Sequence, residues 1–376
     1  ELKTPMKKVG LIVNPIAGMG GRVGLKGTDG EFAQAKATEL GAKPESTRRA
    51  MEAMQSLIPV RDEIEIVTYP EDMGETAARS AGFSPTVIGQ IVKGSTTFED
   101  TRRAALDMTM GGVDLLIFVG GDGTARDILD AVDTNITTLG VPAGVKLYSA
   151  VYGTTSQHAG RVALSYLRGD IVETRDAEVM DVDENAFREG FLMARLYGYL
   201  NIPDEKLHVQ AVKSGGNQPE GPGLSELGKA VMETIVPGVL YIMGPGTTVA
   251  AIKTAMGIDG SLLGIDVVKD NQLLARDVGE NNLLDLIGVQ NAKIIISVIG
   301  GQGYLFGRGN QQISPEVLRK VGRSNIIIAA TVEKLTALHG RPLLVDTGDL
   351  GLDTELSGYW KIITGRNEYS MHRVSD

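Results

Sequence analysis

The chain has 376 residues, 42% of them hydrophobic and 22% charged, so it is long enough for two domains and too apolar for wholesale disorder. Its formal net charge of −10 argues against a nucleic-acid partner, although local cations and backbone amides can still bind a small phosphorylated ligand. It contains no cysteine, which excludes disulfides, zinc–thiolate sites and a cysteine nucleophile.

Membrane and export signals are not expected. The sequence has no run of 18 apolar residues, so it predicts no transmembrane helix and no membrane partner. Residues 1–5 precede Met6, where a natural chain is expected to start, and no signal peptide is recognisable there. We therefore expect a cytoplasmic protein.

The first part of the chain alternates short apolar runs, predicted as buried parallel strands, with helical segments. The predicted elements are strand 9–13, helices 31–40 and 46–57, strand 63–68, helix 73–81, a helix from Thr97 to Met110 with Asp100 completing a capping box, strand 114–119 and helix 125–132. Strands that alternate with helices in this way predict an α/β fold with a doubly wound, mostly parallel sheet.

The pattern changes near residue 145, where shorter strands appear, and predicts a second, β-rich α/β domain. We place the domains at 6–145 and 146–376, with a C-terminal segment able to return to the first. The expected elements are strand 139–142, helix 151–167, strand 177–182, a polar loop 215–223, strand 238–243, a helix to Met256, apolar runs 261–268, 293–299 and 326–330, helix 314–321, and strands 343–345 and 360–364.

The strongest motif is Gly120-Gly121-Asp122-Gly123-Thr124, between a predicted strand and a predicted helix. Glycines at a strand end let backbone amides approach phosphate closely, and the following helix adds its positive end. An Asp would repel phosphate, but it suits a residue that accepts a proton from an attacking hydroxyl or helps to hold a metal ion. The alternative is a tight turn with an Asx hydrogen bond.

A second glycine motif follows the first predicted strand. Asn14-Pro15 leads into Gly18, Gly20 and Gly21, which do not satisfy G-x-G-x-x-G, and no acidic residue completes a dinucleotide site. The sequence therefore does not favour hydride transfer.

Other candidate contacts to a nucleotide or its phosphates lie later in the chain, and each could instead be part of a turn or of the surface. Arg308 amid glycines could clamp a phosphate, and Asn310 could recognise a base or ribose. We expect Lys253 to be solvated and Asp346 and Asp349 to form a turn. The remaining candidates are Lys146, Gly244, Gly246, Thr247 and Thr248.

Asn-Pro-x-Ala-Gly at 14–18 together with Gly-Gly-Asp-Gly-Thr at 120–124 resembles the superfamily of NAD kinases, diacylglycerol kinases and sphingosine kinases. Further stretches look like the ATP-NAD kinase-like branch, predicted polyphosphate/ATP-NAD kinases that include the acetoin-catabolism-associated AcoX proteins. These are 120–127, 142–146, 240–248, 300–315 and 345–349.

The resemblance implies that Asn14 and Gly18 lie by the nucleotide, that Gly120, Gly121, Gly123 and Thr124 cradle phosphates, and that Asp122 activates the acceptor. It also implies a β-rich second domain that closes the cleft. NAD kinases carry an Asn-Glu or Asn-Asp pair for the substrate ribose and a Thr-Gly-Ser-Thr-Ala-Tyr stretch, and neither occurs here in a matching context.

We therefore expect a kinase that uses ATP or polyphosphate and Mg²⁺, with metal ligands unknown, to phosphorylate the 2′-hydroxyl of NAD. Another hydroxylated metabolite is the alternative acceptor. A regulatory protein that binds a nucleotide without turnover is the alternative from another class. A homo-oligomer is expected in each case.

Overall fold

The computed structural model describes residues 6–21, 23, 39, 44–132, 136–144, 147–182, 194–205, 208–210 and 222–376. Its contacts divide the chain into two units. Unit 1 holds the described residues of Glu1–Met19, Lys43–Asp183 and Ala194–Val212. Unit 2 holds those of Gly20–Ala42, Glu184–Met193 and Lys213–Asp376.

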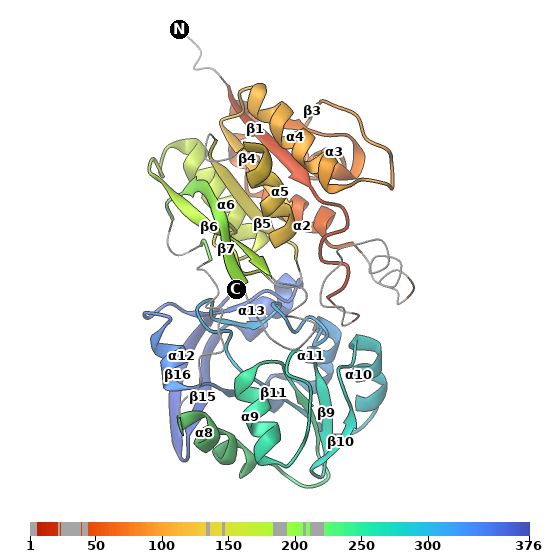
Figure 1. Cartoon of the computed structure of the whole chain (residues 1–376), viewed down its shortest axis with the longest axis vertical. Coiled ribbons are helices and arrows are strands. Elements are labelled where there is room, and N and C mark those ends of the chain that lie inside the picture. Colours follow the sequence, from red (N-terminus) through yellow and green to blue (C-terminus); the bar gives the residue numbers. More distant parts are fainter. Residues whose placement is uncertain are drawn as a thin grey trace. The chain divides into compact units, whose positions relative to one another are not determined.

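Unit 1 is built on a parallel sheet with the strand order β3-β2-β1-β4-β5 (Figure 1). α4 packs against α5, and α2 packs against α6, on the sheet that they cover. The strands are β1 (Lys7–Val13), β2 (Ile64–Thr68), β3 (Thr86–Val87), β4 (Leu115–Gly120) and β5 (Thr138–Pro142), and the helices are α2 (Ser46–Gln55), α3 (Glu75–Ser80), α4 (Phe98–Met110), α5 (Asp122–Val132) and α6 (Ser156–Arg168). An antiparallel pair, β6 (Thr174–Val182) and β7 (Ala194–Pro203), completes the unit.

The centre of this sheet follows directly from its apolar sequence. Every residue of β4 is buried, as are the last five residues of β1, because strands covered by helices on both faces need apolar side chains on both. α4 begins as predicted, with the backbone N–H of Thr97 donating to Asp100 Oδ2 at 2.8 Å.

The strand order reverses at the β1/β4 pair. β1 leads outward to β2 and β3, whereas β4 leads to β5 on the other side. In open α/β sheets, ligands bind outside the carboxyl ends of the strands at such a switch point. Val13 pairs with Val119, so the two predicted glycine motifs leave the sheet side by side.

Unit 2 contains a mixed sheet which, within the described residues, has nine strands in the order β10-β9-β8-β11-β13-β15-β16-β14-β12. β8, β11, β13 and β15 are parallel neighbours, and β16 is antiparallel to β15. The strands are β8 (Leu240–Met243), β9 (Asp266–Lys269), β10 (Gln272–Ala275), β11 (Ala292–Ile296), β12 (Tyr304–Phe306), β13 (Ile326–Ala329), β14 (Leu343–Val345), β15 (Gly358–Gly365) and β16 (Glu368–Ser375). The helices are α8 (Pro222–Met232), α9 (Thr247–Ala255), α10 (Glu280–Ile287), α11 (Pro315–Val321), α12 (Val332–Thr336) and α13 (Leu350–Leu356).

The predicted fold class is confirmed: a doubly wound parallel sheet is followed by a second α/β unit rich in strands. The division between the units lies later than residue 145, because α6 packs on α2 and β7 packs on β5 of the first sheet. The described C-terminal strands belong to unit 2. The predicted helix 31–40 lies almost wholly outside the described residues, as does most of the loop 215–223.

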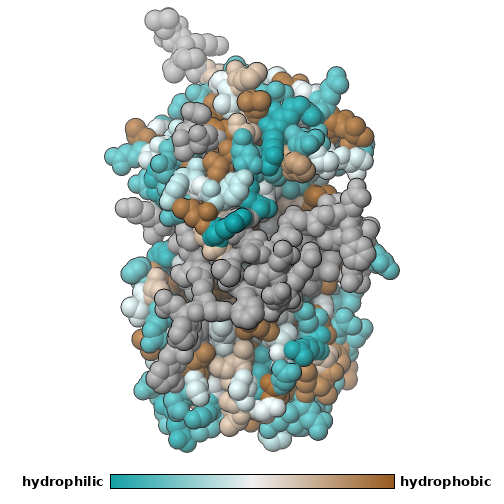
Figure 2. Space-filling model, in the orientation of Figure 1, coloured by the Kyte–Doolittle hydropathy of each residue, from teal (hydrophilic) through white to brown (hydrophobic). Residues whose placement is uncertain are grey.

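The surface shows hydrophilic and hydrophobic residues intermingled on the drawn face of each unit (Figure 2). Among the helices of the described ranges, none combines the length and apolar character needed to cross a membrane.

Candidate functional site

Three loops meet at the carboxyl edge of the unit 1 sheet. The amide of Asn14, directly after β1, donates to the carbonyl of Val119 in β4 at 3.0 Å. The amides of Ala143 and Gly144, directly after β5, both donate to the carbonyl of Gly120, at 3.0 and 3.2 Å. The turn after β4 is therefore held from both sides, at the place where the strand order predicts a ligand site.

Side chains link the two predicted motifs. Asn14 Nδ2 donates to Thr124 Oγ1 at 2.9 Å, and Asn14 Oδ1 accepts from the amide of Ile16 at 3.2 Å. Thr124 is buried in the first turn of α5. The structure thus brings together Asn14, Gly18, Gly120, Gly121, Asp122, Gly123 and Thr124, which were predicted from separate parts of the sequence.

Glycine is required where these loops approach one another most closely. A Cβ on Gly120 would lie 2.2 Å from Thr124 Oγ1, and one on Gly144 would lie 2.8 Å from the Cα of Gly121. Gly18 has φ +79°, and its added Cβ would lie 2.0 Å from the carbonyl oxygen of Ala143. Glycine is therefore required for these loops to pack together, and residues without side chains are also those that let a backbone approach phosphate closely.

Replacing Gly120 by alanine is expected to damage both stability and turnover. The new methyl must displace Thr124 and break its bond to Asn14, which we expect to cost about 1–3 kcal/mol of unfolding free energy. A shift of the turn by about 1 Å would reduce phosphoryl transfer by about 100-fold. Urea unfolding and a kinase assay measure the two effects. Gly223→Ala is the control, because a Cβ there meets no atom within 4 Å; equal behaviour of the two variants would contradict the prediction.

Asp122 begins α5, and its carboxylate accepts hydrogen bonds from the segment that follows β5. Oδ2 accepts from the amide of Tyr148 at 2.8 Å, and Oδ1 accepts from the amide of Ser149 at 3.0 Å. The Ser149 hydroxyl also favours the ionised form of this carboxyl and so lowers its pKa. Burial raises the pKa of the Asp122 carboxyl, and these bonds together with Arg126 oppose that rise. A carboxylate has about four acceptor positions, so the two amide bonds leave an acceptor position open for a further donor.

A tyrosine fixes the turn from the same direction. Tyr152 donates its hydroxyl to the carbonyl of Gly121 at 2.5 Å, and its ring stands edge-on to Phe118 with centroids 5.5 Å apart. Gly140 leaves space for this ring, since a Cβ there would lie 2.4 Å from it. Sequence reasoning missed Tyr148, Ser149 and Tyr152, although the stretch 142–146 just before them was singled out.

One helical turn further on, burial raises the pKa of Asp127 to about 6, and the nearby Arg102 and Arg126 partly offset the effect. Folding therefore favours the protonated acid. Its contribution to stability is complete below the unfolded pKa of 3.8 and is lost as the pH rises through about 6.

Asp127→Asn is consequently expected to gain stability relative to the wild type as the pH rises from 4 to 7. The shift of about two units corresponds to at most ~3 kcal/mol. Solvent screening reduces this value, because the side chain is 16% exposed. Urea unfolding of both proteins across this range measures the difference, and a difference independent of pH would contradict the prediction.

The predicted glycine turn of unit 2 joins β8 to α9. Gly246 precedes the helix with φ +104°, and Thr247 is the first helical residue. Thr248 is fully buried, and its Oγ1 accepts from Lys334 Nζ at 2.7 Å. The roles predicted for Gly244, Gly246, Thr247 and Thr248 stay predictions.

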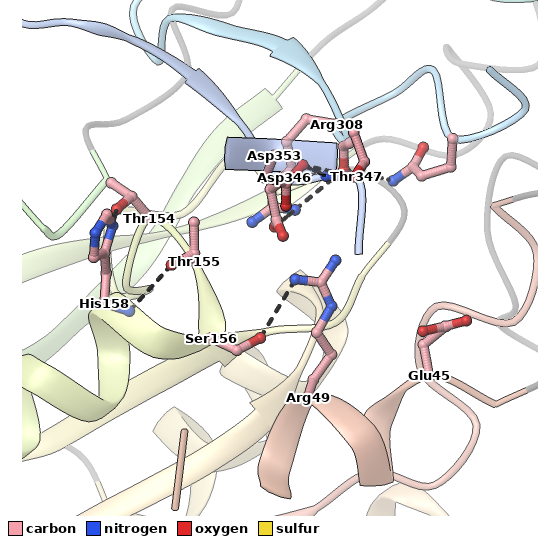
Figure 3. Close-up of polar contacts among 12 residues, drawn as sticks. Glu45, Arg49, Thr154, Thr155, Ser156, His158, Arg308, Asp346, Thr347 and Asp353 are labelled. Atoms are coloured by element: carbon pink, nitrogen blue, oxygen red, sulfur yellow. Dashed lines mark hydrogen bonds and ion pairs between the residues drawn. The ribbon is translucent and has the colours of Figure 1, made fainter. Parts of the chain in front are cut away.

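Arg308 and Asp346 point toward one another in a buried ion pair (Figure 3). Arg308 Nη1 lies 2.6 Å from Asp346 Oδ2, and its guanidinium lies over the Tyr304 ring. Asn310 closes the same loop, because its side chain bonds the amide of Gly307 and the carbonyl of Leu305. A phosphate contact by Arg308 and nucleotide recognition by Asn310 stay predictions.

The other acidic residues of this segment have structural partners. Asp349 caps α13 by accepting from the amide of Leu352 at 3.0 Å, and it pairs with Arg319. The expectation that Lys253 is solvated is wrong: it is 1% exposed and contacts Asp266 at 2.7 Å.

The predicted site residues fall in both units. Gly20 and Gly21 belong to unit 2, where Gly21 lies against the side chain of Gln311. Lys146 lies outside the described residues. His, Asp and Glu side chains do not gather in threes as a metal site anywhere in the described ranges.

Comparison with known proteins defines the class. Residues 9–171 match the ATP-NAD kinase N-terminal domain, and residues 236–374 match the ATP-NAD kinase C-terminal domain. These two domains cover most of the chain, which therefore belongs to the NAD kinase-like superfamily.

Solved structures with some likeness include three of diacylglycerol kinases from Bacillus anthracis str. Sterne, two of them described as putative. Two are 17% identical with a TM-score of 0.26, covering 48% of this chain and 44% or 45% of theirs. The third is 18% identical with a TM-score of 0.23, covering 48% and 49%. The chain thus spans less than half the length of these structures. No curated protein matches it.

Proposed function

We propose that the chain transfers the terminal phosphoryl group of ATP to a hydroxyl, and that the first acceptor to test is the 2′-hydroxyl of the adenosine ribose of NAD, which gives NADP. The observation that carries this proposal is the arrangement at the switch point. Asn14 and the turn 120–124 lie side by side there, and Asp122 stands at the start of α5.

Each part of the arrangement has a chemical role in this proposal. Amides of the glycine turn and the positive end of α5 contact the donor phosphates. The open acceptor position of Asp122 takes the hydrogen of the attacking hydroxyl, which orients its oxygen toward the phosphorus. Mg²⁺, held largely by the phosphates and water, neutralises charge on the donor when bound.

For the identity of the phosphoryl acceptor, the proposal has a second candidate. The sequence lacks the Asn-Glu or Asn-Asp pair that holds the ribose in NAD kinases, and Glu280-Asn281-Asn282 has the wrong order. In the structure this run opens α10, whose start is capped by Gly279. A different hydroxylated metabolite is therefore the second candidate, with the same reaction.

An acceptor panel separates these candidates. The purified chain is incubated with Mg²⁺, ATP and NAD, and NADP is measured by an NADP-specific dehydrogenase, with polyphosphate replacing ATP in a parallel series. Rapid NADP formation supports NAD as acceptor. Labelled phosphate that enters another hydroxylated compound instead would exclude NAD. The expected homo-oligomer and cytoplasmic location stay predictions.

A further inference from the structure

The segment 147–154 after β5, here called the clamp loop, holds Asp122 from outside the glycine turn. Ser149 is its most heavily used residue and is completely buried. It gives Asp122 its backbone amide, at 3.0 Å, and its hydroxyl lowers the pKa of the Asp122 carboxyl. Ser149 Oγ accepts from the amide of Met180 at 2.9 Å, and the hydroxyl hydrogen remains available as a donor.

Gln210 holds Ser149 in turn. This side chain is 1% exposed, and its Nε2 donates to the carbonyl of Ser149 at 2.6 Å. The amide of Gln210 donates to the carbonyl of Tyr152 at 2.9 Å. Because only the nitrogen can donate to a carbonyl, the orientation of the side-chain amide is fixed.

This fixed orientation has a cost. The Oε1 atom of Gln210 is buried and makes no hydrogen bond in the described part of the chain. Buried acceptors without partners are rare in folded proteins, and each calls for a reason. The contacts give one reason: Gln210 must direct its Nε2 to the carbonyl of Ser149.

The rest of the clamp loop is anchored as well, so its contacts with Asp122 are rigid. The amide of Ala150 donates to the backbone carbonyl of Glu178 in β6 at 2.8 Å. The amide of Thr154 donates to the backbone carbonyl of His208 at 2.7 Å. Thr154 also contacts the ring of His158, at the start of α6 (Figure 3). A carboxylate held by such a loop cannot turn freely.

We propose that Ser149 and Gln210 are positioning residues of the kinase: Ser149 fixes the Asp122 carboxylate so that its open acceptor position faces the acceptor hydroxyl, and Gln210 fixes Ser149. This inference rests on the proposed function of Asp122. The charged and titratable groups that act on Asp122 are Arg126, on α5, and Tyr148, within the clamp loop itself.

Loss of these contacts has a predictable kinetic signature. The Ser149 hydroxyl favours the ionised carboxylate, so without it the pKa of Asp122 rises and the acid limb of the pH profile moves to higher pH. The orientation of the acceptor hydroxyl is also lost, which lowers kcat, whereas nucleotide binding to the glycine turn, and hence KM, changes little.

The test compares Ser149→Ala, Ser149→Thr and Gln210→Met with Thr138→Val. Thr138 is a fully buried residue of β5 whose hydroxyl bonds the carbonyl of Asn201, so its loss affects folding alone. We expect Ser149→Ala and Gln210→Met to lower kcat by about 10–100-fold with KM within about twofold, and the acid limb to shift upward in Ser149→Ala. Ser149→Thr should recover part of the rate.

Wild-type kcat and an unshifted acid limb in Ser149→Ala and Gln210→Met would overturn the inference, as would equal kinetic losses in Thr138→Val. Should Ser149→Ala not fold, Gln210→Met carries the test, because it keeps the Ser149 hydroxyl. Asp122→Asn separates the two proposals. Full turnover in Asp122→Asn rejects the proposed mechanism itself. An inactive Asp122→Asn beside fully active Ser149 and Gln210 variants rejects only the positioning role.

Discussion

Asp122→Asn is expected to reduce phosphoryl transfer by about 10²–10⁴-fold while the protein stays folded. The asparagine side chain cannot take up a proton. Its Nδ2 would face one of the two backbone amides that, in the wild type, donate to the carboxylate oxygens. Burial already raises the pKa of Asp122, so removing the negative charge offsets part of the cost of these facing donors. The loss should therefore appear in kcat rather than in the yield of folded protein.

Asp130→Asn is the matched control for this measurement. Asp130 lies on the same helix, and its side chain is 29% exposed and pairs with Arg102. The substitution is chemically identical but removed from the glycine turn, so turnover should match the wild type. Initial rates with the best acceptor and thermal unfolding of all three proteins give the comparison. If Asp122→Asn kept near-wild-type turnover, Asp122 would have no part in moving the proton.

The core of the candidate site could be predicted from the sequence because its determinants are local. An apolar run, a glycine turn and a helix follow one another at 115–132, and parallel strands place such turns at one edge of the sheet. The sequence did not predict the pairing of β1 with β4; only the resemblance to the kinase superfamily implied that both motifs lie by the nucleotide. The register of Val13 with Val119 then brings Asn14 to Thr124.

The network behind Asp122 could not be predicted, because its members are distant in the sequence. Gln210 contacts Ser149 although the β6–β7 pair lies between them in the chain. Local boundaries were also missed there. α5 begins at Asp122 rather than Ala125, and α6 begins at Ser156 because Tyr152 and Gly153 form bridges with Gly140 and Val209.

In unit 2, the environment of Lys253 was mispredicted for a similar reason. Lys253 appeared solvated because its position on α9 gives no sign of a partner. That partner, Asp266, comes from β9, and Gly260 makes the room, since a Cβ there would lie 2.6 Å from Lys253 Cδ. The pairing of Arg308 with Asp346 likewise joins residues that are distant in sequence.

Lys253→Met is expected to destabilise the protein by about 3–5 kcal/mol, because it leaves the Asp266 carboxylate buried without its cation. Burial would raise the pKa of Asp266, but hydrogen bonds from Lys253, the amide of Asp277 and Ser261 outweigh it and lower the pKa. The methionine fills a similar volume, so the loss reflects charge rather than a cavity. Urea unfolding at pH 7 gives the magnitude.

Lys229→Met is the control for this prediction. Lys229 forms an exposed pair with Glu226, with side chains 58% and 68% exposed, so its loss should change the stability by no more than about 1 kcal/mol. The pH dependence gives a second criterion. A lowered folded pKa stabilises the wild type above the unfolded value of 3.8, and that stability is lost as the pH falls through the folded pKa. Lys253→Met raises the folded pKa, so its deficit relative to the wild type should shrink as the pH falls below about 4. A deficit that stayed constant from pH 7 to pH 3 would show that packing, not the ion pair, makes Lys253 important.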